Sequence, residues 1–450
     1  MSADSDEKVA IENATKIIDR LTKEIEALYK FRDLFFENHP LEMATQRNII
    51  VEDRKKLLVE KCETIDVDTQ IPFSMRAQFL YLKGRCYNIG PAYEGKALQY
   101  LSKAVKLNPS LTAAWNELGE CYWKNMNMKD AKASFEGALK NQRNRLSLRC
   151  LSVIIRQQNN DRIHHERVAL LLNSVEMAKE AVALDIKDGM SWMVLGNAYL
   201  CQFFTVAQDP NTLKLCMSAY KQAWLDPVAR GQPDLYFNKG VALKYEEIYD
   251  EALQNFVHAT RLDPLWVQPQ ADCEKLTNYL KDTNELVHTR GKLKAKRLAH
   301  LVRSIDKKML GVYSEGTFHT FGTRRDVTLT LCRLDELIAG ENRGKVVLAR
   351  VVGSIHNENS VPFTFAIVDE SYMCVCVTVY NWADGRGAII GDCVAIPEPY
   401  LTVHKHESDL TTYDFKSLRL NNPLLLLVNG KRVDKNQFAS TCITTKIEIQ

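Results

Sequence analysis

The sequence of 450 residues predicts a multidomain fold, in which an all-α solenoid of helical repeats precedes a small all-β barrel. Two observations predict it. A spaced set of aromatic and small residues recurs along the first two thirds of the chain, and from about residue 325 the apolar residues alternate with a period of two. We therefore expect four parts: N-terminal capping helices in 1–65, the solenoid in 66–289, a basic linker in 290–324 and the barrel in 325–450.

The N-terminal part predicts two amphipathic helices, over residues 9–38 and 41–62. In the first, Ile17, Ile18, Leu21, Ile25 and Leu28 recur at helical spacing. A solenoid needs atypical end units, because a terminal repeat must present a polar outer face to solvent. We therefore expect these helices to cap the solenoid.

The repeat pattern is clearest after Trp115. Its further members, at +3, +4, +7, +16, +20 and +23, are Leu118, Gly119, Tyr122, Ala131, Phe135 and Ala138. This is the pattern of the tetratricopeptide repeat (TPR), a helix–turn–helix unit of about 34 residues. The small residues are expected where the two helices approach closely, and the large ones between neighbouring repeats.

Similar offsets recur in four more units, which begin at Leu80, Leu148, Trp192 and Tyr236. The second helix arrives about ten residues late in the degenerate unit at Leu148 and eight residues late in the unit at Trp192. A closing helix is expected over 267–289. Stacked repeats of this kind form a superhelix with a concave groove.

A basic segment follows, from Arg290 to Lys308. It holds eight positive charges and one negative charge, Asp306, within 19 residues, whereas the whole chain carries a net charge of only +3. That overall balance excludes a globally basic nucleic-acid-coating protein, so any phosphate-rich partner must be met by this local patch. The alternative is that the segment is a solvated linker.

The last part predicts strands separated by turns. They are expected at 327–331, 345–352, 363–368, 373–379, 391–396, 413–418 and 424–428, the last ending in the turn Asn429-Gly430. A long strand, a hairpin, a break near 381–390 and a Gly-Asp-x-Val-x-Ile strand fit a five-stranded OB-fold barrel best. Phe363, Phe365 and Ile367 share one face, which favours barrel core over a platform for stacking bases.

The sequence predicts no enzyme. It has no GxGxxG, Walker, HExxH or GxSxG motif, so no catalytic residue and no cofactor are expected. The twelve cysteines form no CxxC pair, and no His/Cys cluster has the spacing of a zinc site. His164 and His165 are adjacent, and adjacent side chains rarely share a metal. His404 and His406 could face one side of a strand, but the acids near them are ordinary surface residues, so no metal is expected. We expect reduced thiols of the cytosol or nucleus.

No membrane partner is expected either. The N-terminus is polar and acidic, unlike a signal peptide, and the longest aliphatic run, Leu424 to Val428, is too short to span a bilayer. These features predict a soluble, intracellular protein.

The groove offers a candidate binding site. First-helix positions −2, +1, +2, +5 and +8 from the Trp position should face it. These offsets select Arg156, Asn197, Asp234, Phe237 and Asn238. One arginine, one aspartate and two asparagines among apolar walls predict recognition of a short peptide that carries both charge signs. The alternative is that Arg156 and Asp234 are merely solvated on their helices.

Together these features resemble one family, the ribosome-associated specificity factors of tubulin autoregulation, which join TPRs to a C-terminal OB-like domain. The resemblance extends from Phe31 to Gly430. Its most specific stretches are 101–107, 191–199, 243–247, 361–365 and 390–399.

The resemblance implies that the protein binds the N-terminal Met-Arg-Glu-Ile or Met-Arg-Glu-Cys of nascent tubulin at the ribosome. It would then trigger decay of tubulin mRNA through an adaptor that brings a deadenylase. The family's peptide contacts fall on Arg156 and Asp234, and its ribosome contacts fall on Lys294 and Lys296. With their neighbours Lys292 and Arg297, these lysines form the candidate ribosomal RNA contact.

The family is also described as a stress-responsive nuclear cofactor of a histone acetyltransferase and of the p53 response to DNA damage. The resemblance therefore implies both cytoplasmic and nuclear pools. A nuclear coactivator scaffold and an OB-fold nucleic-acid binder stay open as alternatives. Relatives carry Trp-Pro-Glu-Pro where this chain has Trp266-Val-Gln268-Pro269, which predicts that an acidic contact at the groove end is missing.

Overall fold

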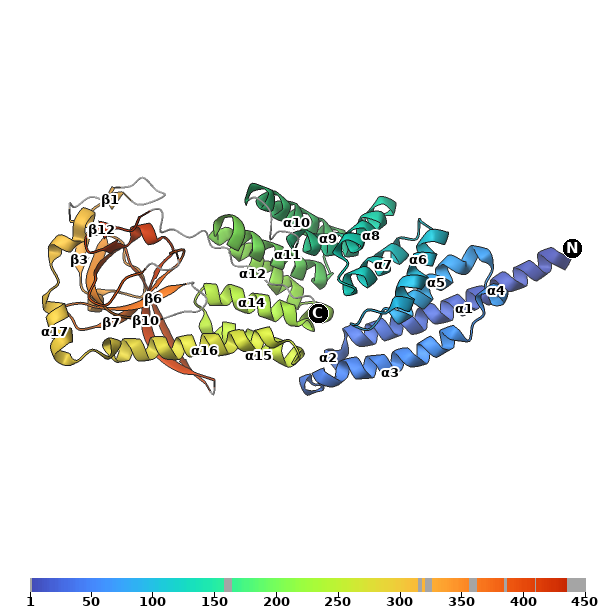
Figure 1. Ribbon diagram of the computed structural model, residues 1–450, viewed down its shortest axis with the longest axis horizontal. Coiled ribbons are helices and arrows are strands. Elements are labelled where there is room, and N and C mark those ends of the chain that lie inside the picture. The colour runs from blue at the N-terminus through green and yellow to red at the C-terminus, as the bar shows by residue number, and fades with distance from the viewer. Residues whose placement is uncertain are drawn as a thin grey trace. The chain divides into compact units, whose positions relative to one another are not determined.

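The computed structural model describes residues 2–157, 164–314, 318–319, 326–355, 362–383, 387–408 and 410–434 (Figure 1). These residues divide into two compact units, one up to Gln270 and one from Ala271. Helices precede strands along the chain, so the predicted order of an all-α solenoid and an all-β barrel is confirmed.

The first unit contains helices and no strand among its described residues. Its helices are α1 (Ser2–Asp33), α2 (Phe35–Asn38), α3 (Ala44–Glu63), α4 (Val67–Gln70), α5 (Phe73–Tyr87), α6 (Gly95–Leu107), α7 (Thr112–Lys124), α8 (Met128–Asn141), α9 (Arg145–Gln157), α10 (His164–Leu184), α11 (Gly189–Gln202), α12 (Pro210–Trp224), α13 (Pro227–Arg230), α14 (Pro233–Tyr245) and α15 (Tyr249–Leu262). The next helix, α16 (Val267–His288), begins in this unit and continues into the second.

The five predicted repeats are the helix pairs α5–α6, α7–α8, α9–α10, α11–α12 and α14–α15. Close contact between the two helices of a repeat requires the small residue that we expect in the first helix. A Cβ atom added to Gly119 would lie 2.7 Å from the ring of Phe135, which is fully buried. An aromatic ring packs in the same way on Gly196 and Gly240, and the side chain of Leu101 does so on Gly84.

The N-terminal helices differ from the prediction at their junction. The first helix ends at Asp33 rather than near residue 38, and the short α2 precedes a turn at His39-Pro40. The imidazole of His39 stacks on Phe35 at 4.2 Å between ring centroids. α1 and α3 form a hairpin joined by this turn, and Leu21, Ile25 and Cys62 are buried in its core.

The segment predicted as a linker is folded where the structure describes it. It forms α17 (Ala295–Arg303) and two 3-10 turns, Arg290–Lys292 and Lys307–Tyr313. Leu298 and Val302, one helical turn apart, are buried against Val352, Ala366 and Val368 of the barrel. This helix is part of the second unit, because its apolar face covers the sheet.

The strands of the second unit are β1 (Phe318–His319), β2 (Asp326–Val327), β3 (Thr330–Cys332), β4 (Gly340–Glu341), β5 (Lys345–Ile355), β6 (Phe363–Val368), β7 (Cys374–Val379), β8 (Cys393–Pro397), β9 (Tyr400–Glu407), β10 (Thr412–Leu420), β11 (Leu427–Val428) and β12 (Lys431–Arg432). Two predicted strands are shorter than expected. Residues 327–331 divide between β2 and β3, and in 424–428 a 3-10 turn from Pro423 to Leu425 leaves only two residues in β11, because Pro423 favours a helical first turn.

The barrel path confirms the OB-fold prediction. β5 pairs antiparallel with β6 and β8, β6 with β7, and β9 with β10, whereas β7 and β10 are parallel. Only Glu398 and Pro399 separate β8 from β9, so these two strands are one bent strand that borders β5 at one end and β10 at the other. The path of five long strands therefore returns to itself. Phe365 and Ile367 are fully buried inside it.

Candidate peptide-binding site

Arg156 lies in the last turn of α9 and is buried, with 7% of its surface exposed. Its Nη1 donates hydrogen bonds to Oγ of Ser152 at 2.7 Å and to Oγ of Ser174 at 2.9 Å. Within the described residues, its Nε and Nη2 have no hydrogen-bond partner. Burial lowers the pKa of Arg156, since a guanidinium without a counter-charge is poorly solvated there. Among the described residues, no carboxylate pairs with this guanidinium.

The surroundings of Arg156 are polar but uncharged. Tyr220 on α12 donates from Oη to Oδ1 of Asn197 on α11 at 2.8 Å. Both side chains are buried, and burial raises the pKa of Tyr220 well above its usual value. Tyr220 and Cys201 act on Arg156 electrostatically, so Asn197, Tyr220 and Arg156 form one neighbourhood.

Asp234 is the second residue of α14 and is half-buried. In the described part of the chain it forms no hydrogen bond or ion pair. Burial, and then the carboxylate of Asp263, raise the pKa of Asp234 to about 6. A helix N-terminus usually lowers the pKa of a carboxyl group, so the loss of solvent outweighs the helix dipole at this position.

The expectation that Arg156 and Asp234 are both exposed on the concave face is wrong for Arg156. The second helix of its repeat, α10, arrives late in the sequence and places Ser174 against the guanidinium. Asn238 and Phe237 are buried too, and the Phe237 ring packs on Trp266 at 4.8 Å. Phe237 therefore belongs to the core of the last repeat.

Sequence reasoning missed the residues that hold this site. Four repeats carry glycine at position +4, and the degenerate repeat carries Ser152 there. The serine at this glycine position was a signal in the sequence that could have indicated polar surroundings for Arg156. No such signal pointed to Ser174 or Asp263, because both lie outside the positions expected to face the groove.

The basic residues Lys292, Lys294, Lys296 and Arg297 are all exposed. Lys292 pairs with Glu285 at 2.8 Å, and this hydrogen bond raises the pKa of Lys292. Lys292 therefore has an acidic partner in the last turn of α16. The other three form no ion pair in the part of the chain that the structure describes. These three residues stand at the start of α17, where the helix dipole is positive and repels their charges. Binding of an anionic partner would offset this repulsion.

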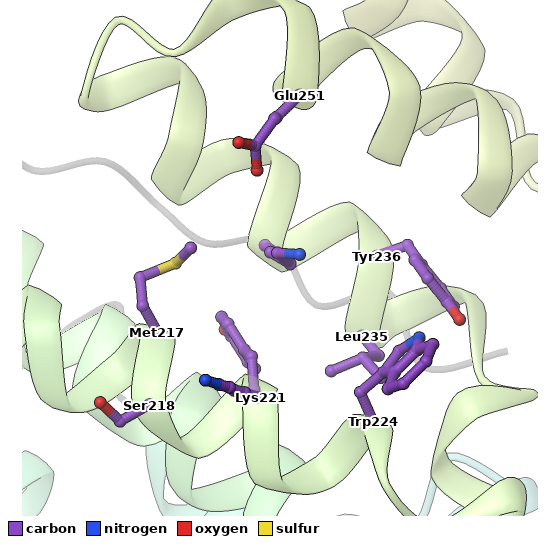
Figure 2. A pocket seen from close by; sticks show the side chains of 9 residues that line it. Met217, Ser218, Lys221, Trp224, Leu235, Tyr236 and Glu251 are labelled. Carbon is purple, nitrogen blue, oxygen red and sulfur yellow. The ribbon is translucent and has the colours of Figure 1, made fainter.

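A separate pocket of about 500 Å³ lies among α12, α14 and α15 (Figure 2). In Figure 2, Trp224 and Tyr236 lie together on one side, and Glu251 lies apart from them. Two lysines, Lys221 and Lys239, complete its charged lining. Its lining therefore offers both charge signs beside two aromatic rings.

His404 and His406 each have a partner within the barrel. His404 is buried, with Nε2 2.8 Å from Oγ of Ser417, and His406 stacks on Tyr413. The structure describes no group of side chains that could hold a metal ion. The side chain of His164 lies outside the described residues. None of the described helices is long and apolar enough to cross a membrane.

Comparison with known proteins identifies relatives over nearly the whole chain. Residues 328–442 match the tetratricopeptide repeat protein 5 OB fold domain, and residues 112–145 match a tetratricopeptide repeat. Tetratricopeptide repeat protein 5 of Homo sapiens is 40% identical over 432 residues, 96% of each chain. That of Mus musculus is 39% identical over 436 residues, 97% of this chain and 98% of its own. The solved TPR protein YrrB is 20% identical, with a TM-score of 0.31, over 48% of this chain and 97% of its own.

Proposed function

The chain belongs to the tetratricopeptide repeat protein 5 family, and from this premise we propose that it binds the N-terminal Met-Arg-Glu-Ile or Met-Arg-Glu-Cys of nascent tubulin at the ribosome. Binding would mark the translating mRNA for decay through an adaptor and a deadenylase, so the protein acts as a scaffold. The observation that carries the proposal is the buried guanidinium of Arg156, which has two nitrogen atoms without partners among the described residues.

The chemistry of the motif fits the two charged residues. The peptide's glutamate supplies the anion that Arg156 lacks, and its arginine supplies a cation for Asp234. A hydrogen bond to a charged group contributes about 1.5–3 kcal/mol. A buried charge left unpaired is costly, so occupation by an ionised partner is favoured further.

Four residues make few contacts, so their affinity is modest. Lys294, Lys296 and Arg297 offer a second point of attachment on ribosomal RNA phosphates. Attachment there would raise the effective concentration of the nascent peptide at the groove without new peptide contacts. This division of labour explains why a short motif suffices on a ribosome.

The test is recovery of ribosome–nascent-chain complexes by the full-length protein. Complexes that display the tubulin N-terminus should be recovered, and complexes with Met-Glu-Arg-Ile, which has the same composition, should not. Equal recovery of both would contradict the proposal. Recovery of an acetyltransferase complex regardless of the nascent chain would favour the coactivator scaffold, and binding of a bare oligonucleotide through the barrel would favour a nucleic-acid binder.

A further inference from the structure

The tip of the N-terminal hairpin, residues 34–47, contacts the far end of the solenoid. Oε1 of Glu37 accepts hydrogen bonds from Nε and Nη2 of Arg230, at 3.3 and 2.9 Å, across 193 residues of sequence. Oε1 of Glu42 accepts one from Nη2 of Arg261 at 2.9 Å, across 219 residues. In Figure 1 the turn after α2 lies beside the end of α15, as these contacts require.

Other contacts of the tip lie near the proposed arginine-binding carboxylate. The ring of Phe36 lies close to Gly231: a Cβ atom added to Gly231 would lie 3.8 Å from Cδ2 of Phe36. Arg47 stands over the Phe36 ring at 5.5 Å and interacts with Asp263, the same carboxylate that raises the pKa of Asp234. The tip therefore ends at the repeat that carries Asp234.

Close to its tip, the hairpin is also held by the first repeats. Oη of Tyr29 on α1 donates to Oε2 of Glu117 on α7 at 3.3 Å, and Lys55 on α3 pairs with Glu94. Glu117 occupies offset +2, one of the groove-facing positions. The hairpin thus joins the second repeat to the fifth.

We propose that this hairpin is a strap over the groove and that its ion pairs make the peptide site selective for a chain end. The inference rests on the proposed function. A polypeptide passes beneath a strap attached at both ends either by threading a free terminus or after the strap opens, so a Met-Arg-Glu-Ile that lies between two folded domains must wait for the strap to open. The tip's ion pairs are partly exposed, with Glu42 69% and Arg261 55% exposed. Such pairs contribute little each, so the strap can open.

The experiment compares two peptides on the full-length protein: Met-Arg-Glu-Ile at a free N-terminus, and the same sequence fused at both ends to folded domains that cannot thread beneath the strap. The wild type should bind the free end faster. Glu37→Arg with Glu42→Arg should open the strap and speed the association of the fused peptide about tenfold, because each attraction becomes a repulsion. The affinity of the free-end peptide should change by less than about threefold, since neither residue is a peptide ligand.

Two sets of variants control for fold. Adding Arg230→Glu and Arg261→Glu to that variant exchanges the charges and should restore discrimination. Asp19→Arg with Glu60→Arg places the same charge change on exposed sites of the hairpin away from the tip and should leave discrimination unchanged. Hydrogen exchange over residues 34–47 reports opening directly.

The outcomes separate the two proposals. Raised exchange at the tip with unchanged discrimination would overturn the strap and leave the proposed function standing. Unchanged exchange would also overturn it, because the ion pairs would then not hold the tip. Failure of the wild type to bind either peptide would overturn the proposed function and the strap's selectivity with it.

Discussion

Nη1 of Arg156 lies 2.7 Å from Oγ of Ser152, one helical turn earlier on α9. Ser152 occupies the position at which the other four repeats carry glycine. The hydroxyl anchors one end of the guanidinium and leaves its Nε and Nη2 without partners in the described structure. One substitution in the repeat pattern thus converts a packing position into part of the proposed binding site.

Replacing Arg156 should separate binding from stability. Arg156→Met removes the anion-binding group and should weaken binding of the tubulin N-terminal peptide about ten- to a hundredfold. The thermal midpoint should stay unchanged or rise, since the change removes a buried charge without a counter-charge. Fluorescence anisotropy and calorimetry on the same variant measure both. Unchanged affinity would show that Arg156 only holds the repeat together.

Peptide affinity should depend on pH through Asp234. Its pKa of about 6 means that the carboxylate loses its charge as the pH falls from 7 to 5, so affinity for the arginine-bearing peptide should fall over that range. Asp234→Asn should bind weakly and show a flatter profile. A wild-type profile that is flat between pH 7 and 5 would contradict this role.

Without bound peptide, Asp234 should affect the stability of the protein in the opposite sense to an ordinary carboxylate. Its folded-state pKa is raised from 3.8 to about 6, so the folded state binds more protons within that window. The contribution of Asp234 to the free energy of unfolding is therefore highest below pH 4 and falls as the pH rises to 6. Denaturant titrations of the wild type and Asp234→Asn should diverge across this window.

Charge reversal in the basic segment should remove ribosome binding alone. Lys294→Glu with Lys296→Glu should sharply reduce cosedimentation with ribosomes and lower the salt slope by about two. Free peptide should still bind. Lys275→Glu with Lys281→Glu, on exposed sites of α16 in the same unit, is the control with equal charge. Persistent ribosome binding at physiological salt would place the contact elsewhere.

The packing of the repeats can be tested by adding one methyl group. Gly119→Ala would place a Cβ atom 2.7 Å from the Phe135 ring and should destabilise the protein by about 1–3 kcal/mol, because the core is overpacked. Gly95→Ala, whose Cβ atom would meet only Oη of Tyr93 at 3.8 Å, should be close to neutral. Equal effects in denaturant unfolding would contradict close packing at Gly119.

Much of the fold was predictable from local patterns. The repeat offsets identified each helix pair, because a TPR buries its aromatic residues against neighbours at fixed positions in the sequence. The strand at 363–368 was predicted with its observed bounds, because its apolar and β-branched residues are buried, on one face in the barrel core and on the other beneath α17. The same offsets selected Arg156 and Asp234, since the position of a residue on a helix follows from its number.

By itself, the sequence determined the order of the two folds, the helices of the solenoid and the residue types offered at the groove. The tertiary structure alone decided that Arg156 is buried, because Ser174 reaches it from a helix whose place in the repeat is displaced by an insertion. It also decided that the hairpin tip meets Arg230 and Arg261. Such contacts join residues about two hundred positions apart, and no local periodicity records them, because they depend on the accumulated rotation of every repeat between their partners.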